Sequence, residues 1–183
     1  MITQSNFDTL HGILPGKHFY QFYKNLDDFL CVMIPFFQAG LEKGEACLWL
    51  VSKRNDFDQA YIAAQTVIPQ SSNYISSGQF QILSAEEWYL TEGSFDEAKA
   101  MANALQYLEK IQKQGFKQLR GAGDGGVISR KDWPLVEAYE KKMGPWIKSN
   151  SIIALCAYPI LECTPSQTKE ILDCHEDVLV GRI

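Results

Sequence analysis

Short apolar segments alternate with helical patterns along most of the chain, and this alternation limits the fold more than any other feature. The strand candidates are residues 18–23, 46–51, 79–83, 116–120, 152–157 and 177–180. Strands separated by helices indicate a parallel sheet, because each helix returns the chain to the edge where the next strand begins. Residues 46–51, ACLWLV, are apolar on both faces, as is typical of a central parallel strand. We therefore expect a three-layer α/β/α sandwich with a mostly parallel central sheet.

The first strand, helix and strand, residues 18–51, are arranged like a nucleotide-binding unit that lacks its phosphate loop. In such a unit the first turn carries Gly-x-x-x-x-Gly-Lys-Ser/Thr, whose backbone amides hold phosphates. Here the turn is YKNLDD, residues 23–28, which has no glycine and adds two carboxylates. The helix expected from about 26 to 42 contains Pro35, which predicts a kink or a short break near residues 31–35. The pattern favours a binding or sensing module over an NTPase.

Three further helices are predicted from their capping residues and apolar spacing. SFDE, residues 94–97, has the pattern of a capping box and opens a helix that ends at Gly115. A second helix is expected from about 133 to 148. Thr164-Pro165 opens the last helix, which leads to His175.

Composition and charge limit the class of partner. The chain has 183 residues, of which 46% are hydrophobic and 21% charged, as in an ordinary globular domain. We expect an N-terminal arm over residues 1–15 and one domain over residues 16–183. The net charge of -5 and the absence of a basic run argue against direct contact with nucleic acid or an anionic membrane. Neither a membrane-spanning stretch nor a signal peptide is recognisable, so the expected location is the cytoplasm.

The five cysteines include no C-x-x-C pair. Three of them lie in apolar runs, where a reduced thiol acts as a small hydrophobic group: Cys31, Cys47 and Cys156. Cys163, Cys174 and His175 form the grouping that could suggest a metal, but their spacing fits none of the common zinc patterns. We therefore expect neither a metal nor a cofactor.

The clearest candidates for ligand contacts surround a glycine-rich segment. Residues 121–126, GAGDGG, contain a formal G-x-G-x-x-G without a helix starting inside it, so a mobile loop beside a pocket is favoured over a dinucleotide site. Arg120 and Asp124 are expected at the carboxyl end of the preceding strand, where open α/β sheets bind ligands. They could hold a polar ligand group, or form a simple salt bridge. Tyr23 and Tyr158 would approach the same edge and supply hydroxyls and aromatic walls.

Catalytic signatures are missing from the sequence. It contains no G-x-S-x-G motif, and the adjacent Glu86 and Glu87 would point in different directions on a helix. No catalytic residue is predicted, and we expect the protein not to be an enzyme.

The order of many modest motifs resembles the MEDS domain, the methanogen/methylotroph DcmR-type sensory domain. The resemblance is carried by HFYQFY (18–23), IPFF (34–37), GLEKGE (40–45), SAEE (84–87) with Tyr89, Leu119-Arg120 with Gly123-Asp124, Tyr139-Glu140, ALCAY (154–158) and His175. These motifs cover about residues 16–180. The resemblance implies a degenerate RecA/KaiC-like fold and the sensing of small molecules, for which hydrocarbon derivatives have been proposed as ligands.

The resulting expectation is a cytoplasmic, non-catalytic sensory domain that binds a small organic ligand at the carboxyl edge of the sheet. Arg120 and Asp124 are the predicted polar anchors, Tyr23 and Tyr158 the walls, and Glu140 a residue that orients Arg120. The domain would act in signal transduction or transcription regulation through a separate protein, such as a histidine kinase or a DNA-binding regulator, or by self-association as a homodimer.

Two other functions stay open at this point. The first is a KaiC-like nucleotide-binding protein with a rewired phosphate loop, which would use Lys24 and Arg120 for phosphates and Asp27 and Asp28 for magnesium. The second is an interaction adaptor for a kinase or sigma-factor circuit, marked by a large exposed apolar patch without a ligand-sized cavity.

Overall fold

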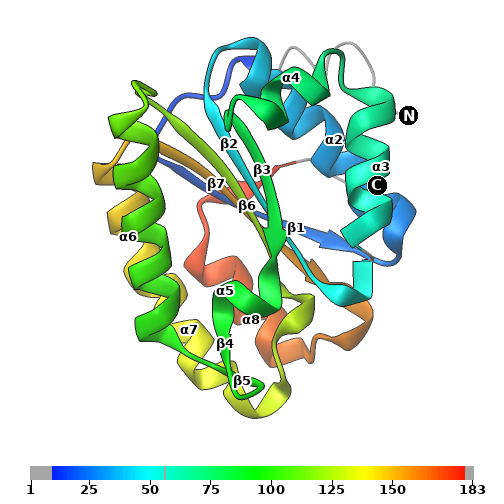
Figure 1. Cartoon of the computed structure of the whole chain (residues 1–183). Coiled ribbons are helices and arrows are strands. Elements are labelled where there is room, and N and C mark those ends of the chain that lie inside the picture. The colour runs from blue at the N-terminus through cyan, green and yellow to red at the C-terminus, as the bar shows by residue number, and fades with distance from the viewer. Residues whose placement is uncertain (1–9, 56, 180–183) are drawn as a thin grey trace.

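The computed structural model is an α/β/α sandwich, as expected (Figure 1). It describes residues 10–55 and 57–179, and within these ranges six parallel strands form one sheet in the order β3-β2-β6-β7-β1-β8. The strands are β1 (Lys17–Tyr23), β2 (Ala46–Val51), β3 (Phe80–Ser84), β6 (Leu119–Asp124), β7 (Ile152–Pro159) and β8 (Asp177–Val178). A separate antiparallel pair consists of β4 (Leu90–Thr91) and β5 (Ser94–Phe95).

The helices divide between the two faces of the sheet. One face carries α2 (Leu26–Glu42), α3 (Phe57–Val67) and α4 (Ser71–Ser76), and the other carries α5 (Ala85–Tyr89), α6 (Glu97–Lys113), α7 (Trp133–Ser149) and α8 (Pro165–Cys174). Short 3-10 turns connect them: η1 (Lys53–Asn55), η2 (Gly125–Val127), η3 (Arg130–Asp132) and η4 (Ile160–Glu162). In the part of the chain that the structure describes, no helix combines the length and the apolar character needed to cross a membrane.

The face that α2 and α3 cover is packed with aromatic side chains. Phe37 lies 5.3 Å from Trp49 and 5.2 Å from Phe80 between ring centroids, and Phe29 adjoins the same group. Such offset and tilted rings fill a core densely. Every residue of β2 is buried, which confirms that residues 46–51 form an interior strand.

Several helix boundaries follow from local capping, although one predicted cap is wrong. Thr164 caps the start of α8 as expected, and Gln167 completes a reciprocal cap that was not predicted. By contrast, α6 begins at Glu97 because Asp96, and not Ser94, accepts a hydrogen bond from the amide of Lys99. The predicted break at Pro35 does not occur, since α2 is continuous from Leu26 to Glu42.

The glycine-rich segment differs most from the prediction. The strand expected at residues 116–120 is β6, Leu119–Asp124, so its last four residues are the first four of the supposed loop. Gly121 and Gly123 are therefore strand residues within the sheet. The longer strand places Arg120 near the start of β6, whereas Asp124 stays at its carboxyl end. Of the predicted last strand, residues 177 and 178 form β8, and residue 180 lies outside the described residues, as do residues 1–9 of the predicted arm.

Candidate functional site

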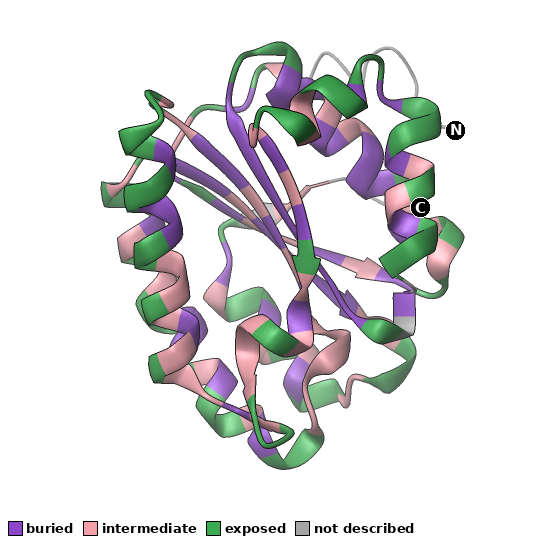
Figure 2. Cartoon of the chain, viewed as in Figure 1, coloured by how far each residue is buried: buried purple, intermediate pink, exposed green. Residues whose placement is uncertain are grey.

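The centre of the sheet is hollow on the face that α6 and α7 cover. The residues of β6 and β7 on this face include Gly121, Gly123, Ala154 and Cys156, and they are neighbours because Gly121 pairs with Ala154 and Gly123 with Cys156. All four are partly exposed, whereas residues that alternate with them are buried; Figure 2 shows this alternation as pink and purple bands. Central strands beneath helices are normally buried on both faces. The small residues therefore leave space between the sheet and the helices.

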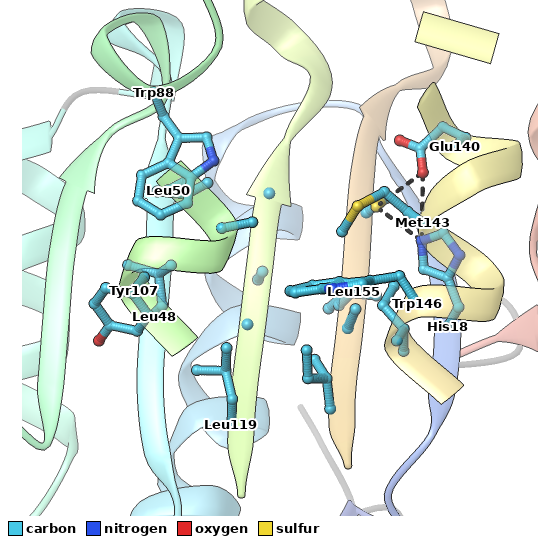
Figure 3. Close-up of a pocket in the computed structure, with 18 of the residues that line it drawn as sticks. His18, Leu48, Leu50, Trp88, Tyr107, Leu119, Glu140, Met143, Trp146 and Leu155 are labelled. Atoms are coloured by element: carbon cyan, nitrogen blue, oxygen red, sulfur yellow. Dashed lines mark hydrogen bonds and ion pairs between the residues drawn. The ribbon is translucent and has the colours of Figure 1, made fainter. Parts of the chain in front are cut away.

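This space is an apolar cavity. Its volume is about 80 Å³, counting positions that the centre of a water molecule can occupy. A space of this size can hold more than one water and is suited to a small organic molecule. Figure 3 shows Trp88 and Tyr107 on one side and Met143 and Trp146 on the other. Trp88, Met143 and Trp146 are half-buried and border the opening.

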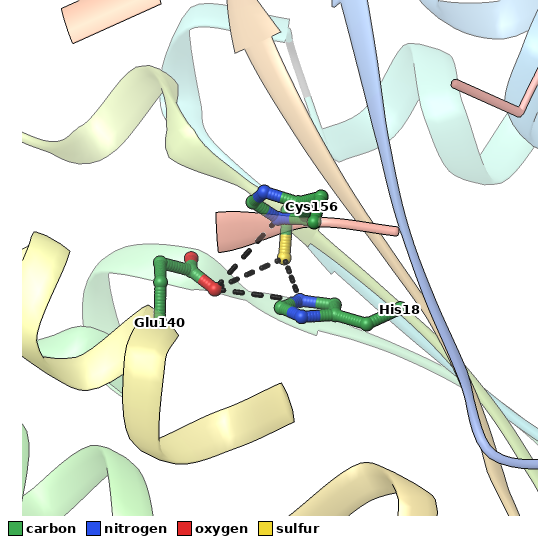
Figure 4. Close-up of side chains that lie close together, drawn as sticks. His18, Glu140 and Cys156 are labelled. Atoms are coloured by element: carbon green, nitrogen blue, oxygen red, sulfur yellow. Dashed lines mark hydrogen bonds and ion pairs between the residues drawn. The ribbon is translucent and has the colours of Figure 1, made fainter. Parts of the chain in front are cut away.

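Four polar side chains from four elements gather at one end of the cavity. They are His18 of β1, Glu140 of α7, Cys156 of β7 and His175, which directly follows α8. The Oε2 atom of Glu140 lies 3.4 Å from Nε2 of His18 and 3.8 Å from Nε2 of His175. The Sγ atom of Cys156 lies 3.3 Å from Nε2 of His18, as Figure 4 shows. We call these four residues the polar cluster.

The surroundings of Glu140 keep it ionised. Burial raises the pKa of this carboxyl, but opposing effects, led by the hydrogen bond and charge of His18, lower its pKa to about 2. Tyr158 Oη donates to Oε1 of Glu140 across 2.8 Å. The other carboxylate oxygen, Oε2, is the one that faces the polar cluster.

His175 is held as a neutral imidazole of defined orientation. Burial is the main cause that lowers its pKa, although Glu140 opposes the effect. Nδ1 lies 2.6 Å from the carbonyl oxygen of Ile171, one turn back in α8. Because a carbonyl can only accept, the proton is on Nδ1 and the lone pair is on Nε2.

The arrangement is unsuited to nucleophilic catalysis by Cys156. A cysteine nucleophile reacts as the thiolate. Burial, followed by the charge of Glu140, raises the pKa of the Cys156 thiol well above its usual range. The close contact with His18 does not offset these two effects, so the thiol stays protonated.

The prediction placed Arg120 at the wrong end of its strand. Arg120 is the second residue of β6, and its side chain points into the α2 layer, away from α7. Its Nε donates to Oε2 of Glu45 across 2.6 Å, and one of its terminal nitrogens donates to the carbonyl oxygen of Phe36. Glu140 comes from the opposite face of the sheet and cannot orient it. Arg120 is therefore an interior structural residue and not a ligand anchor.

Asp124 does lie at the carboxyl edge, and the structure brings Tyr23 to it. The hydroxyl of Tyr23 donates to Oδ1 across 2.8 Å, while the amide and hydroxyl of Ser52 and the amide group of Asn55 donate to Oδ2. Asp124 is fully buried. Protein donors thus occupy this carboxylate, and the network ties together the ends of β1, β2 and β6.

Tyr158, the remaining predicted wall, lies between the polar cluster and a second hollow at the carboxyl edge. This hollow measures about 260 Å³ on the same scale and is lined by more polar residues, among them Arg130, Glu162 and Gln167. It is larger than the cavity, but polar side chains form more of its lining. An apolar ligand gains more from the cavity, because transfer of apolar surface out of water drives its binding.

In the turn after β1, side chains of the turn itself accept hydrogen bonds from two backbone amides. The side chain of Asn25 accepts a hydrogen bond from the amide of Asp28 across 2.9 Å, and Asp28 accepts one from the amide of Lys24 across 3.1 Å. A helix N-terminus binds phosphate through such amides. Here the helix caps itself.

Sequence reasoning missed the polar cluster as a group. The sequence groups His175 only with Cys163 and Cys174, and the spacing of that grouping argues against a metal site. Among the described residues, His175 lies instead beside Glu140, His18 and Cys156. Cys31, expected to be buried, is exposed. The sequence did contain a signal for the cavity beside this cluster. It was the pair of small residues at every second position of one strand, Gly121 and Gly123.

Comparisons with known proteins agree with this architecture. The family model described as "MEDS: MEthanogen/methylotroph, DcmR Sensory domain" matches residues 17–176. A search of curated proteins gave no match. Among solved structures, the crystal structure of the flagellar accessory protein FlaH from Methanocaldococcus jannaschii is similar, with a TM-score of 0.51 and 11% identity over 96% of this chain and 76% of that chain. This likeness shows the fold alone, which is RecA/KaiC-like.

Proposed function

This chain belongs to the MEDS family of sensory domains, and we propose that it senses a small, mainly apolar organic molecule bound between the sheet and helices α5 to α7. One observation carries the proposal: Gly121, Gly123 and Ala154 hollow the middle of the sheet beneath a rim of aromatic side chains. Protein interiors contain few voids larger than a water molecule, because voids cost stability. Three small residues in adjacent strands leave this void, and a ligand that fills it would remove the cost.

The lining indicates the chemical class of this occupant. Trp88, Tyr107, Met143 and Trp146 offer apolar contact, and polar atoms are concentrated at the end where Glu140 lies. Because Glu140 is ionised, it repels carboxylates and favours donors. We therefore expect a compact hydrocarbon derivative with one hydrogen-bond donor, such as a short alcohol or an amine.

The same features disfavour the two other functions. Nucleotide binding would use backbone amides at the start of α2 and a free Arg120. Here side chains of the turn bind the amides of Lys24 and Asp28, and Arg120 is paired with Glu45. An adaptor without a ligand would have no use for an apolar cavity inside the domain. The cavity and the protonated state of Cys156 support a non-catalytic sensor.

A signal requires that the ligand favour one conformation over another, since a ligand with equal affinity for both leaves their populations unchanged. The cavity is bounded by α6 and α7, so an occupant would change their spacing and the position of Met143 and Trp146. The output would pass from this face to a separate signalling protein, such as a histidine kinase or a DNA-binding regulator, or to a second copy of the chain.

The test is thermal unfolding of the purified protein against short alcohols, amines, halogenated alkanes, carboxylates and ATP with magnesium. A ligand at a hundredfold its dissociation constant adds about 2.7 kcal/mol to the free energy of unfolding. The variant Gly121→Val should fold, because a Cβ there would meet only the carbonyl oxygen of Leu48, at 4.0 Å. Its side chain would fill the cavity and abolish the shift.

A matched control adds similar bulk outside the cavity. Ala98→Val on the exposed side of α6 should respond to the ligand like the parent protein. The proposal is wrong if ATP with magnesium alone stabilises the protein, or if Gly121→Val keeps the full response to the organic ligand.

A further inference from the structure

The polar cluster has the spacing of a tetrahedral metal site. One donor atom from each of His18, Glu140, Cys156 and His175 lies within 4.8 Å of all the others. Four of the distances between these donors are 3.3, 3.4, 3.8 and 3.8 Å. Metal–ligand bonds of 2.0–2.3 Å in a tetrahedron place the donors roughly 3.3–3.8 Å apart. The side chains therefore stand close to the positions that a bound cation would require.

Neighbouring groups orient the donors toward a common centre. Tyr158 holds Oε1 of Glu140 and leaves Oε2 directed at the polar cluster, while the carbonyl of Ile171 holds Nδ1 of His175. Metal-binding histidines and carboxylates commonly have such second hydrogen bonds, which fix the tautomer and the direction of the lone pair.

One donor atom of the polar cluster is buried without a hydrogen-bond partner in the part of the chain that the structure describes. Nε2 of His175 has no hydrogen-bond partner among the described residues, and its side chain is 0% exposed. Oε2 of Glu140 lies 3.8 Å from this nitrogen, beyond hydrogen-bond distance. An unpaired buried polar atom is costly. A cation between the two atoms would bond to both.

We propose that His18, Glu140, Cys156 and His175 bind a divalent transition-metal cation, with Zn²⁺ the best match to two imidazoles, a thiolate and a carboxylate. Calcium and magnesium prefer sets of oxygen ligands, whereas nitrogen and sulfur donors suit zinc and its neighbours in the first transition row. Binding would convert the Cys156 thiol to a metal-bound thiolate and release one proton to solvent.

The metal would connect four parts of the fold. His18 and Cys156 lie on β1 and β7, Glu140 lies on α7, and His175 follows α8. Because four protein donors complete a tetrahedron, the cation would hold α7 and the end of α8 to the sheet at the edge of the cavity. This inference does not depend on whether the cavity binds an organic molecule.

The experiment uses the full chain, stripped with a chelator, dialysed and titrated with Zn²⁺ and separately with Co²⁺. We expect one equivalent of either metal, and with Co²⁺ the strong visible bands of a tetrahedral complex and a near-ultraviolet thiolate-to-cobalt band. Cys156→Ser should lose the thiolate band. Tyr158→Phe removes the hydrogen bond to Glu140 and should weaken metal binding by about 10- to 100-fold.

Matched controls separate the site from the other thiols and imidazoles. Cys31→Ser and His11→Gln lie outside the polar cluster and should bind one equivalent with the parental cobalt spectrum. Gly121→Val should also bind the metal, which distinguishes this site from the organic ligand site. The unmodified protein decides the question even where a variant fails to fold. Less than one equivalent, or cobalt bound without a thiolate band, would overturn the proposal.

Discussion

Arg120 and Glu45 form an ion pair inside the protein, with 2.6 Å between Nε and Oε2 and at most 1% exposure of either side chain. Removing one partner of such a pair leaves the other charge buried and costs about 3–5 kcal/mol. We expect Arg120→Ala to lower the free energy of unfolding by about that amount in urea titrations. Lys113→Ala removes the exposed pair with Glu109 and should cost less than about 1 kcal/mol. Equal losses in the two variants would contradict a structural role for Arg120.

Gly40 makes room for this ion pair. A Cβ at residue 40 would lie 2.7 Å from Cδ and Nε of Arg120 and 2.9 Å from Oε2 of Glu45. Alanine favours a helix over glycine by about 0.5–1 kcal/mol, but overpacking costs about 1–3 kcal/mol. Gly40→Ala should therefore destabilise the protein in urea titrations. Gly144→Ala in α7 is the control, because its Cβ would meet only Nδ1 of His18, at 4.0 Å, and it should stabilise. A gain in stability from both variants would show that the pair can move aside.

Asp96 gives the start of α6 a pH-dependent cap. The amide of Lys99, followed by the hydroxyl of Thr91, lowers the pKa of this carboxyl below its ordinary value of 3.8. Because the pKa is lower in the folded protein, the stabilisation is complete above the unfolded value and is lost as the pH falls through the folded value. Asn is as good a helix cap as Asp, but its side chain does not lose or gain a proton as the pH falls.

The measurement for this cap compares the urea midpoints of the parent protein and Asp96→Asn from neutral pH to about pH 2. The midpoint of the parent should fall relative to that of the variant only in the acid range below the ordinary value. A constant difference across the whole range would show that the charge of Asp96 adds nothing to the cap.

The cysteines should differ in reactivity according to their burial. Cys31 is exposed, whereas Cys47 is buried and burial raises the pKa of its thiol well above the usual range. Thiol reagents attack the thiolate, so both effects protect Cys47. We expect the fastest labelling of the folded protein to disappear in Cys31→Ser, and Cys47 to label only on unfolding, as followed by mass spectrometry of peptides. Early labelling of Cys47 in the folded protein would contradict the packing of β2.

The parts of the fold that depend on local patterns could be predicted from the sequence. The apolar run 46–51 is recognisable as an interior strand, and Thr164 with Pro165 marks the start of α8, because a strand pattern and a helix cap each involve only a few neighbouring residues. The family resemblance was confirmed over residues 17–176.

The site could not be predicted in the same way. Gly121 and Gly123 were interpreted as a turn because glycine permits turns, but here the lack of a side chain serves to leave space within a strand. Because of that error, Arg120 was predicted at the carboxyl end of its strand, whereas it lies near the start of β6. The polar cluster depends on tertiary structure, because it is the pairing of β1 with β7 that brings His18 beside Ala154, two residues before Cys156.

The order of strands also has a consequence for how the protein is made. β1 is synthesised before the other strands, yet its two neighbours in the sheet are β7 and β8. While a ribosome is still translating residues 26–151, β1 has no strand to pair with, whereas β2 can already pair with β3. Contacts between distant parts of a chain slow folding, because the intervening loop must be closed first. The aromatic segment 17–23 therefore stays without its partner strands until residues 152–159 have been synthesised.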